Sequence, residues 1–70
     1  MIERVPVSSS TVKSVGHSAE DNTLAVEFKD GSVYHYHNVP KDIHDSLVSA
    51  KSVGSYLHKN VKGAYKHSKQ

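Results

Sequence analysis

The stretch that decides the fold is residues 23–37, which read TLAVEFKDGSVYHYH. Its first half alternates large apolar side chains at Leu24, Val26 and Phe28 with small or charged ones, the pattern of a half-buried β-strand. An Asp-Gly pair then marks a tight turn, and a second strand-like run follows it. The stretch therefore predicts an antiparallel hairpin made of strands 23–29 and 32–37.

The length of this turn decides which side chains face the core. A two-residue turn would pair Phe28 with Val33 and leave both tyrosines on the opposite face. A three-residue turn over residues 29–31 places Gly31 in the left-handed bulge position, which suits glycine. One face then gathers the large apolar residues of both strands: Leu24, Val26, Phe28, Tyr34 and Tyr36. Because a slip of one residue inverts the whole face, we expect burial to select the three-residue turn.

Before the hairpin, residues 11–18 predict a first strand. Val12 and Val15 are three apart, which breaks strict alternation, and a bulge near Ser14 or a twist at Gly16 would reconcile them. Residues 1–8 are expected to be a lead-in, because Pro6 cannot lie in a central strand.

After the hairpin, the pattern changes to that of helices. Pro40 suits the start of a helix, and Ile43 and Leu47 form its apolar stripe. Ser52 is a plausible N-cap for a second helix over residues 53–61, and residues 66–70 are expected to be a flexible tail. The predicted fold is α+β: a three-stranded antiparallel β-meander followed by two short C-terminal helices packed on one sheet face, in a single domain over residues 1–70.

In this order, the landmarks resemble the KTSC domain family over residues 9–65. The N-terminal landmarks are Ser9-Ser10, Val12, Val15-Gly16, Leu24-x-Val26-x-Phe28, Gly31, Tyr34-His35-Tyr36 and Val39-Pro40. The C-terminal ones are Ala50-x-Ser52-x-Gly54-x-Tyr56-Leu57, Val61 and Tyr65. The sequence departs from the family pattern at Leu57 and His58, where Phe and Asn are expected, and this affects only details of helix packing.

The resemblance implies little about function. The family takes its name from a C-terminal extension of some lysyl-tRNA synthetases, and it also occurs as small stand-alone proteins of bacteria and their phages. It implies no catalytic residues. RNA binding is suggested by the synthetase context.

Composition narrows the function classes. A chain of 70 residues without cysteine forms one small domain with no disulfide or thiolate-bound metal. Its apolar runs are far shorter than the roughly 20 residues that span a bilayer, so we expect a cytoplasmic protein that does not bind membranes. So small a core leaves little room for a deep pocket, so no cofactor and no small-molecule substrate are expected.

The charges are segregated along the chain. Residues 1–50 hold four cations and seven acids, a formal charge of −3, whereas residues 51–70 hold five lysines and no acid, a charge of +5. Lysines neutralise phosphate, and neighbouring aromatic rings stack on bases. The candidate nucleic-acid-binding residues are therefore Lys51, His58, Lys59, Lys62, Tyr65, Lys66, His67 and Lys69. The competing interpretation is a solubilising surface that also complements the helix dipole.

Other constellations point more weakly to function. Tyr34 and Tyr36 are favoured as core residues over an RNA-stacking platform, because the helices need that face to cover. His35 and His37 lie two apart, and Glu27 and His17 are the nearest further candidate ligands, but without cysteine we expect no metal site. No nucleophile elbow, glycine-rich phosphate loop or H-E-x-x-H motif is present, so we expect no enzymatic activity.

Two hypotheses from different classes follow. The first is a non-enzymatic module that binds RNA through the lysine-rich surface of residues 51–69. The second is a small protein-interaction domain, or a homodimer, that uses a sheet edge or face. Charge segregation favours the first.

Overall fold

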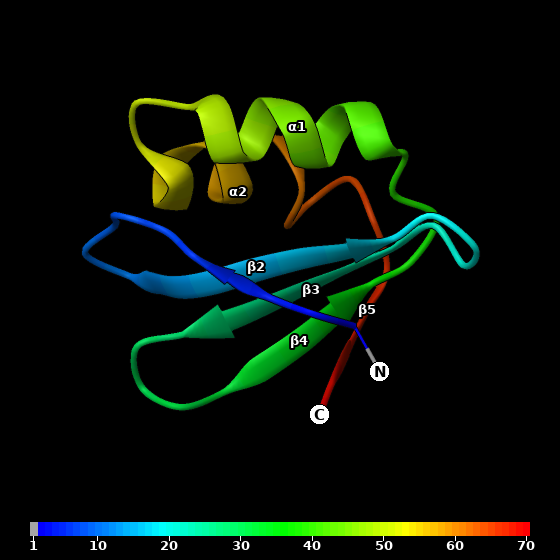
Figure 1. Cartoon of the computed structure of the whole chain (residues 1–70), viewed down its shortest axis with the longest axis horizontal. Helices are drawn as coiled ribbons and strands as arrows, with labels where there is room; N and C mark the ends of the chain where they lie inside the picture. The colour runs from blue at the N-terminus through cyan, green and yellow to red at the C-terminus, as the bar shows by residue number, and fades with distance from the viewer. Residues whose placement is uncertain (1) are drawn as a thin grey trace.

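The computed structural model describes residues 2–70 and contains one antiparallel sheet and two helices. The elements follow the order β1 (Val5–Pro6), β2 (Val12–Ser18), β3 (Thr23–Phe28), β4 (Val33–Tyr36), α1 (Lys41–Ser49), α2 (Val53–Asn60) and β5 (His67–Lys69). The strands lie side by side in that same order, β1-β2-β3-β4-β5, and both helices cover one face of the sheet (Figure 1). The predicted α+β class and the helices on one face are confirmed.

The β3–β4 hairpin has the predicted three-residue turn. Val26 pairs with Tyr34 and Leu24 pairs with Tyr36. The Phe28 N–H donates to the Ser32 carbonyl over 2.8 Å, and Gly31 has a φ of 96°, in the left-handed region where glycine costs least. Burial selects this register, because it places the apolar side chains of both strands toward the helices.

The core lies between the helices and this inner face of the sheet. Val15, Val26 and Leu24 from the sheet meet Leu47 of α1 and Leu57 of α2, and all five side chains are buried. Burying each aliphatic side chain stabilises the domain by about 1.5–3 kcal/mol. The bulge predicted near Ser14 is confirmed, since the β2–β3 register shifts between Val12 and Ser14 and so lets both Val12 and Val15 face inward.

The helices begin and end close to the predicted positions. Pro40 occupies the N-cap of α1 and has an extended conformation, and Ser52 caps α2 by accepting a hydrogen bond from the Ser55 N–H. Helix α2 ends at Asn60, one residue before the predicted end at Val61. Within residues 2–70, neither helix has the length and hydropathy that a membrane crossing requires.

The prediction of only three strands is wrong, because each edge of the sheet gains a short strand. Strand β1 comes from the expected lead-in and pairs with β2, where Pro6 is tolerated because the strand lies at an edge. Strand β5 comes from the expected tail and pairs with β4. All three side chains of β5 are exposed, so this strand is held by backbone hydrogen bonds and leaves no apolar alternation in the sequence.

Candidate nucleic-acid interface

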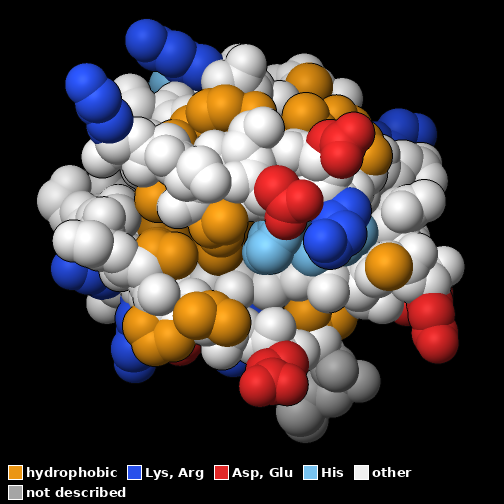
Figure 2. Space-filling view, turned by 45° about the horizontal axis from the view of Figure 1, so that its top comes forward, with side chains coloured by type: hydrophobic (Ala, Val, Ile, Leu, Met, Phe, Trp, Pro, Cys, Tyr) orange, Lys and Arg blue, Asp and Glu red, His pale blue; other side chains and the backbone are white. Residues whose placement is uncertain are grey.

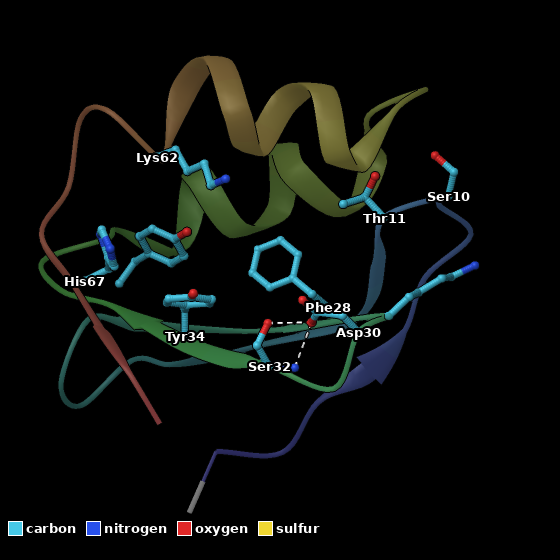
Figure 3. Close-up of a pocket in the computed structure, with 10 residues that line it drawn as sticks. Ser10, Thr11, Phe28, Asp30, Ser32, Tyr34, Lys62 and His67 are labelled. Carbon is cyan, nitrogen blue, oxygen red and sulfur yellow. Dashed lines mark hydrogen bonds between the residues drawn. The ribbon is translucent and has the colours of Figure 1, made fainter.

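An open groove of about 570 Å³ lies between the inner face of the sheet and the end of α2. Side chains from four parts of the chain line it: the segment before β2, the β3–β4 hairpin, the turn after α2, and β5. We call it the aromatic groove, and its lining residues are Ser10, Thr11, Phe28, Lys29, Asp30, Ser32, Tyr34, Tyr36, Lys62 and His67. Figure 3 shows Phe28 and Tyr34 rising from the sheet toward the helices, with Lys62 entering from the helix layer and His67 from β5.

The rings of this groove form a continuous row. Phe28 and Tyr34 meet edge to face with 5.5 Å between their centroids. His67 continues the row, with centroid distances of 5.6 Å to Tyr34 and 5.4 Å to Tyr36. The register of the hairpin causes this arrangement, since it brings Phe28, Tyr34 and Tyr36 to the inner face. Tyr36 is 1% exposed and belongs to the core, whereas Phe28 and Tyr34 are only partly buried and keep ring surface for a ligand.

Positive charge surrounds these rings. The Lys62 ammonium lies 5.9 Å from the centroid of the Phe28 ring, a cation–π distance. Lys29 also lines the groove, and Lys69 lies across from Tyr34 in the β4–β5 pairing. A groove that joins aromatic surface to ammonium groups suits a ligand with flat rings and negative charge.

One carboxylate accompanies the lysines. Asp30 accepts hydrogen bonds at Oδ1 from the Ser32 hydroxyl, over 2.6 Å, and from the Ser32 N–H, over 2.9 Å. These bonds, the hydroxyl one foremost, lower the pKa of the Asp30 carboxyl, and the charge of Lys69 acts in the same direction. Asp30 is therefore ionised at neutral pH. Burial, by contrast, raises the pKa of the Tyr36 hydroxyl, which keeps it neutral.

The structure divides the candidate residues that the sequence suggested. Lys62 and His67 line the aromatic groove, and Lys69 borders it from β5. His58 and Lys59 are exposed on α2, Lys66 is exposed beside β5, and Tyr65 packs partly against the core. On the face shown in Figure 2 the basic side chains lie at separate places and form no continuous patch. Lys62 and Lys51 line different grooves, so these two lysines do not belong to one surface.

Lys51 lies in a different groove, of about 510 Å³, formed by β1 and the segments around the α1–α2 connection. We call it the aliphatic groove, and its lining residues are Val5, Pro6, Val7, Ser8, His44, Val48, Ala50, Lys51 and Val53. It contains the two large apolar side chains that are exposed within residues 2–70, Val5 at 62% and Val48 at 41%.

The residues considered as metal ligands are also divided. His17 pairs with Leu24 and so points to the inner face, where its Nε2 lies 2.6 Å from the Val39 carbonyl oxygen. Glu27 and His35 point to the outer face, where Glu27 accepts a hydrogen bond from the Ser14 hydroxyl. Among the residues that the structure describes, no three potential ligands meet at one point.

The part of the groove that the hairpin supplies was not predictable as a site from the sequence pattern. The sequence pattern predicts Phe28 and Tyr34 as core residues, Lys29 and Asp30 as part of the turn, and Ser32 as the start of the returning strand. The turn chemistry itself was a usable signal, since an Asp followed by Ser two residues later forms such a side-chain-to-backbone hydrogen bond. What the sequence did not reveal is that β5 would bring His67 alongside Tyr34.

Comparisons with known proteins place the chain in a family. Residues 8–65 match the KTSC domain. A lysine–tRNA ligase of Trichormus variabilis is 40% identical over 58 residues, which are 83% of this chain and 10% of that protein. An uncharacterised protein of Stutzerimonas stutzeri is 34% identical over 61 residues, which are 87% of this chain and 86% of that protein.

The fold has a counterpart among solved structures. The crystal structure of a KTSC domain protein from Yersinia pestis covers 100% of this chain and 99% of its own length, with a TM-score of 0.93 and 32% sequence identity. The chain spans about a tenth of the length of the matched lysine–tRNA ligases, in which the domain is one small part. The chain belongs to the KTSC domain family.

Proposed function

We propose that this domain is a non-enzymatic module that binds single-stranded RNA in the aromatic groove. The observation that carries the proposal is the convergence of Phe28, Tyr34 and His67 with the Lys62 ammonium in one open groove. An unpaired base would stack on the partly buried rings, and its flanking phosphate would lie against Lys62. Stacking of one base on an aromatic side chain contributes about 1–3 kcal/mol.

The strand must be single, because the rings lie inside a groove. Bases in a duplex stack on one another and turn only their edges outward, so they have no free face for Phe28 or Tyr34. The groove volume of about 570 Å³ lies within the range of pockets that enclose small ligands. One nucleotide would occupy it, while the neighbouring nucleotides extend over the surface toward Lys29 or Lys69.

The relatives support RNA as the polymer. Lysine–tRNA ligases act on a tRNA, as their name states, and those of Trichormus variabilis and Nostoc carry a domain 38–40% identical to this chain. An appended module that binds RNA would raise the local concentration of tRNA near such an enzyme. This is support by analogy, and the groove supplies the physical argument.

A protein partner has less to support it. The aliphatic groove exposes Val5 and Val48, the kind of surface that a protein partner would cover. Nothing in the described residues selects an occupant for it by charge or shape. RNA binding is therefore the function that we propose for the domain.

The test is fluorescence anisotropy of a labelled single-stranded RNA over a series of salt concentrations. The logarithm of affinity should fall with the logarithm of salt, by about 0.7 per phosphate contact. Lys62→Ala should lower that slope by about 0.7, because Lys62 lies in the aromatic groove. Lys51→Ala removes the same charge from the aliphatic groove and should leave the slope unchanged. Absence of binding at low salt, or equal effects of the two variants, would contradict the proposal.

A further inference from the structure

The aromatic groove contains a negative group where a polyanion would bind. Asp30 lies in the β3–β4 turn and lines the groove beside Phe28 and Ser32 (Figure 3). A carboxylate repels phosphate, so its presence weakens any contact in which the backbone of a nucleic acid passes close to it. A carboxylate accepts hydrogen bonds and donates none once it is ionised. The ligand group that best complements Asp30 is therefore a hydrogen-bond donor.

The structure holds this carboxylate in a fixed orientation. Both hydrogen bonds from Ser32 end on Oδ1, one from the backbone and one from the hydroxyl. Neither of these bonds uses Oδ2, so that oxygen can accept a hydrogen bond from a ligand. Lys29 and Lys69, which lie near Asp30, offset part of its repulsion of the neighbouring phosphates.

A bound nucleotide can offer Asp30 a donor from its base edge or from its sugar, and only the sugar donor is the same in all four ribonucleotides. The base faces contact Phe28 and Tyr34, and the phosphates avoid the carboxylate and turn to Lys62. The sugar lies between base and phosphate, and in RNA it carries a 2′-hydroxyl, which donates one hydrogen bond. A carboxylate that binds a ribose hydroxyl is a recurring way to recognise nucleotides. The 2′-hydroxyl is also the group that distinguishes RNA from DNA.

We propose that Asp30 is a specificity-determining residue that accepts a hydrogen bond from a ribose 2′-hydroxyl, so that the aromatic groove prefers RNA to DNA of the same sequence. This inference rests on the proposed function, because it assumes that a single strand occupies the groove. Under this proposal Asp30 distinguishes ribose from deoxyribose, which neither the aromatic rings nor the lysines can do.

The experiment compares three labelled oligonucleotides of one sequence by anisotropy at a fixed, low salt concentration. They are an RNA, its deoxy counterpart with deoxyuridine in place of uridine, and its 2′-O-methyl form. The RNA should bind about three- to tenfold more tightly than the deoxy form, the range of the net contribution of one ordinary hydrogen bond, because water competes at this exposed site. The 2′-O-methyl form should bind like the deoxy form, because it lacks the donor but retains the oxygen.

Asp30→Asn is the informative variant. Its amide oxygen can still accept the bonds from Ser32, while its NH₂ group replaces Oδ2. The affinity for the deoxy form should stay the same or rise, and the ratio of RNA to deoxy affinity should fall to about one. Asp21→Asn makes the same charge change in the β2–β3 turn, at the other end of β3, and should preserve the ratio.

The outcomes separate the two proposals. Equal binding of RNA and its deoxy form by the unmodified domain, or an unchanged ratio in Asp30→Asn, would overturn the role of Asp30 while leaving a nucleic-acid site in place. Tight binding of the 2′-O-methyl form would also overturn it, because the preference would then arise from sugar shape. If none of the oligonucleotides binds, the proposed function itself fails.

Discussion

The aromatic groove and the aliphatic groove are nearly equal in size, about 570 and 510 Å³, but they differ in chemistry. The first is lined by β5 and β4 at one edge of the sheet, and the second by β1 at the other edge. Rings, two lysines and a carboxylate line the aromatic groove. Aliphatic side chains line most of the aliphatic groove, with Lys51 and His44 among them. Volume alone therefore does not identify a binding site, and the chemistry of the lining must decide.

The two grooves also depend on different contacts. The aliphatic groove needs the N-terminal segment, which passes close to Gly16 of β2. The aromatic groove needs β5, which is held by backbone bonds such as that from the His37 N–H to the Lys66 carbonyl, over 2.8 Å. A substitution can therefore disturb one groove and spare the other.

Gly16→Ala should have the largest effect. An added Cβ would collide with the carbonyl oxygen of Glu3, a backbone atom that cannot rotate away. We expect the free energy of unfolding to fall by about 2–3 kcal/mol, the upper part of the range for overpacking. Chemical denaturation measures this loss. Affinity for single-stranded RNA should remain unchanged in the folded protein, and a parallel loss of RNA binding would show that the grooves are coupled.

Tyr34→Ala should have the next largest effect, this time on binding. It removes the ring between Phe28 and His67, so the affinity for single-stranded RNA should fall by about 1–2 kcal/mol, or roughly 5- to 30-fold. Anisotropy measures this, with circular dichroism to confirm that the variant is folded. Val48→Ala, in the aliphatic groove, is the matched control and should bind normally. Equal losses in both variants would remove the distinction between the grooves.

Ser52→Ala should have a smaller effect, on stability alone. The Ser52 side chain accepts a hydrogen bond from the Ser55 N–H at the start of α2. Loss of this cap should lower the free energy of unfolding by about 0.5–1 kcal/mol. Thermal unfolding measures it, and Ser46→Ala, at an exposed position within α1, should change stability much less. If Ser52→Ala lowered the free energy of RNA binding by more than the free energy of unfolding, the start of α2 would belong to the RNA site.

The smallest effect concerns pH and the outer face of the sheet. Burial, followed by the positive charges of His37 and Arg4, lowers the pKa of His35 below its usual value of about 6.5. The unfolded chain therefore takes up this proton at a higher pH than the folded domain. Stability should be complete above about pH 6.5 and should fall as the pH drops below it. His35→Gln should flatten that acid-side slope, which urea titrations at several pH values would show; an identical slope would contradict it.

Much of the fold was predictable because it depends on local pattern. The alternation at Leu24, Val26 and Phe28, together with a glycine suited to a left-handed turn, determined the hairpin register. The cap at Ser52 and the stripe of Ile43 and Leu47 located the helices. These signals work because apolar burial and backbone conformation act on residues that are close in sequence.

The edge strands and the site were harder to predict for a common reason. Strand β5 buries no side chain, so residues 67–69 show no hydrophobic alternation that would predict its pairing with β4. The charge count treated the five C-terminal lysines as one surface, whereas the fold sends Lys51 and Lys62 to different grooves. Among the residues that line the aromatic groove, the sequence predicted Lys62 and His67 as binding residues. The rings and the carboxylate that face them come from the hairpin, which is about 30 residues earlier.

The most direct test is an NMR titration of the ¹⁵N-labelled domain with an unlabelled single-stranded RNA. Amide shifts should concentrate at residues 28–34, 62 and 67–69, which surround the aromatic groove. The amides of residues 5–8 and 48–53, around the aliphatic groove, should stay in place. Shifts centred on the aliphatic groove, or spread equally over all the lysines including Lys51 and Lys59, would contradict the account.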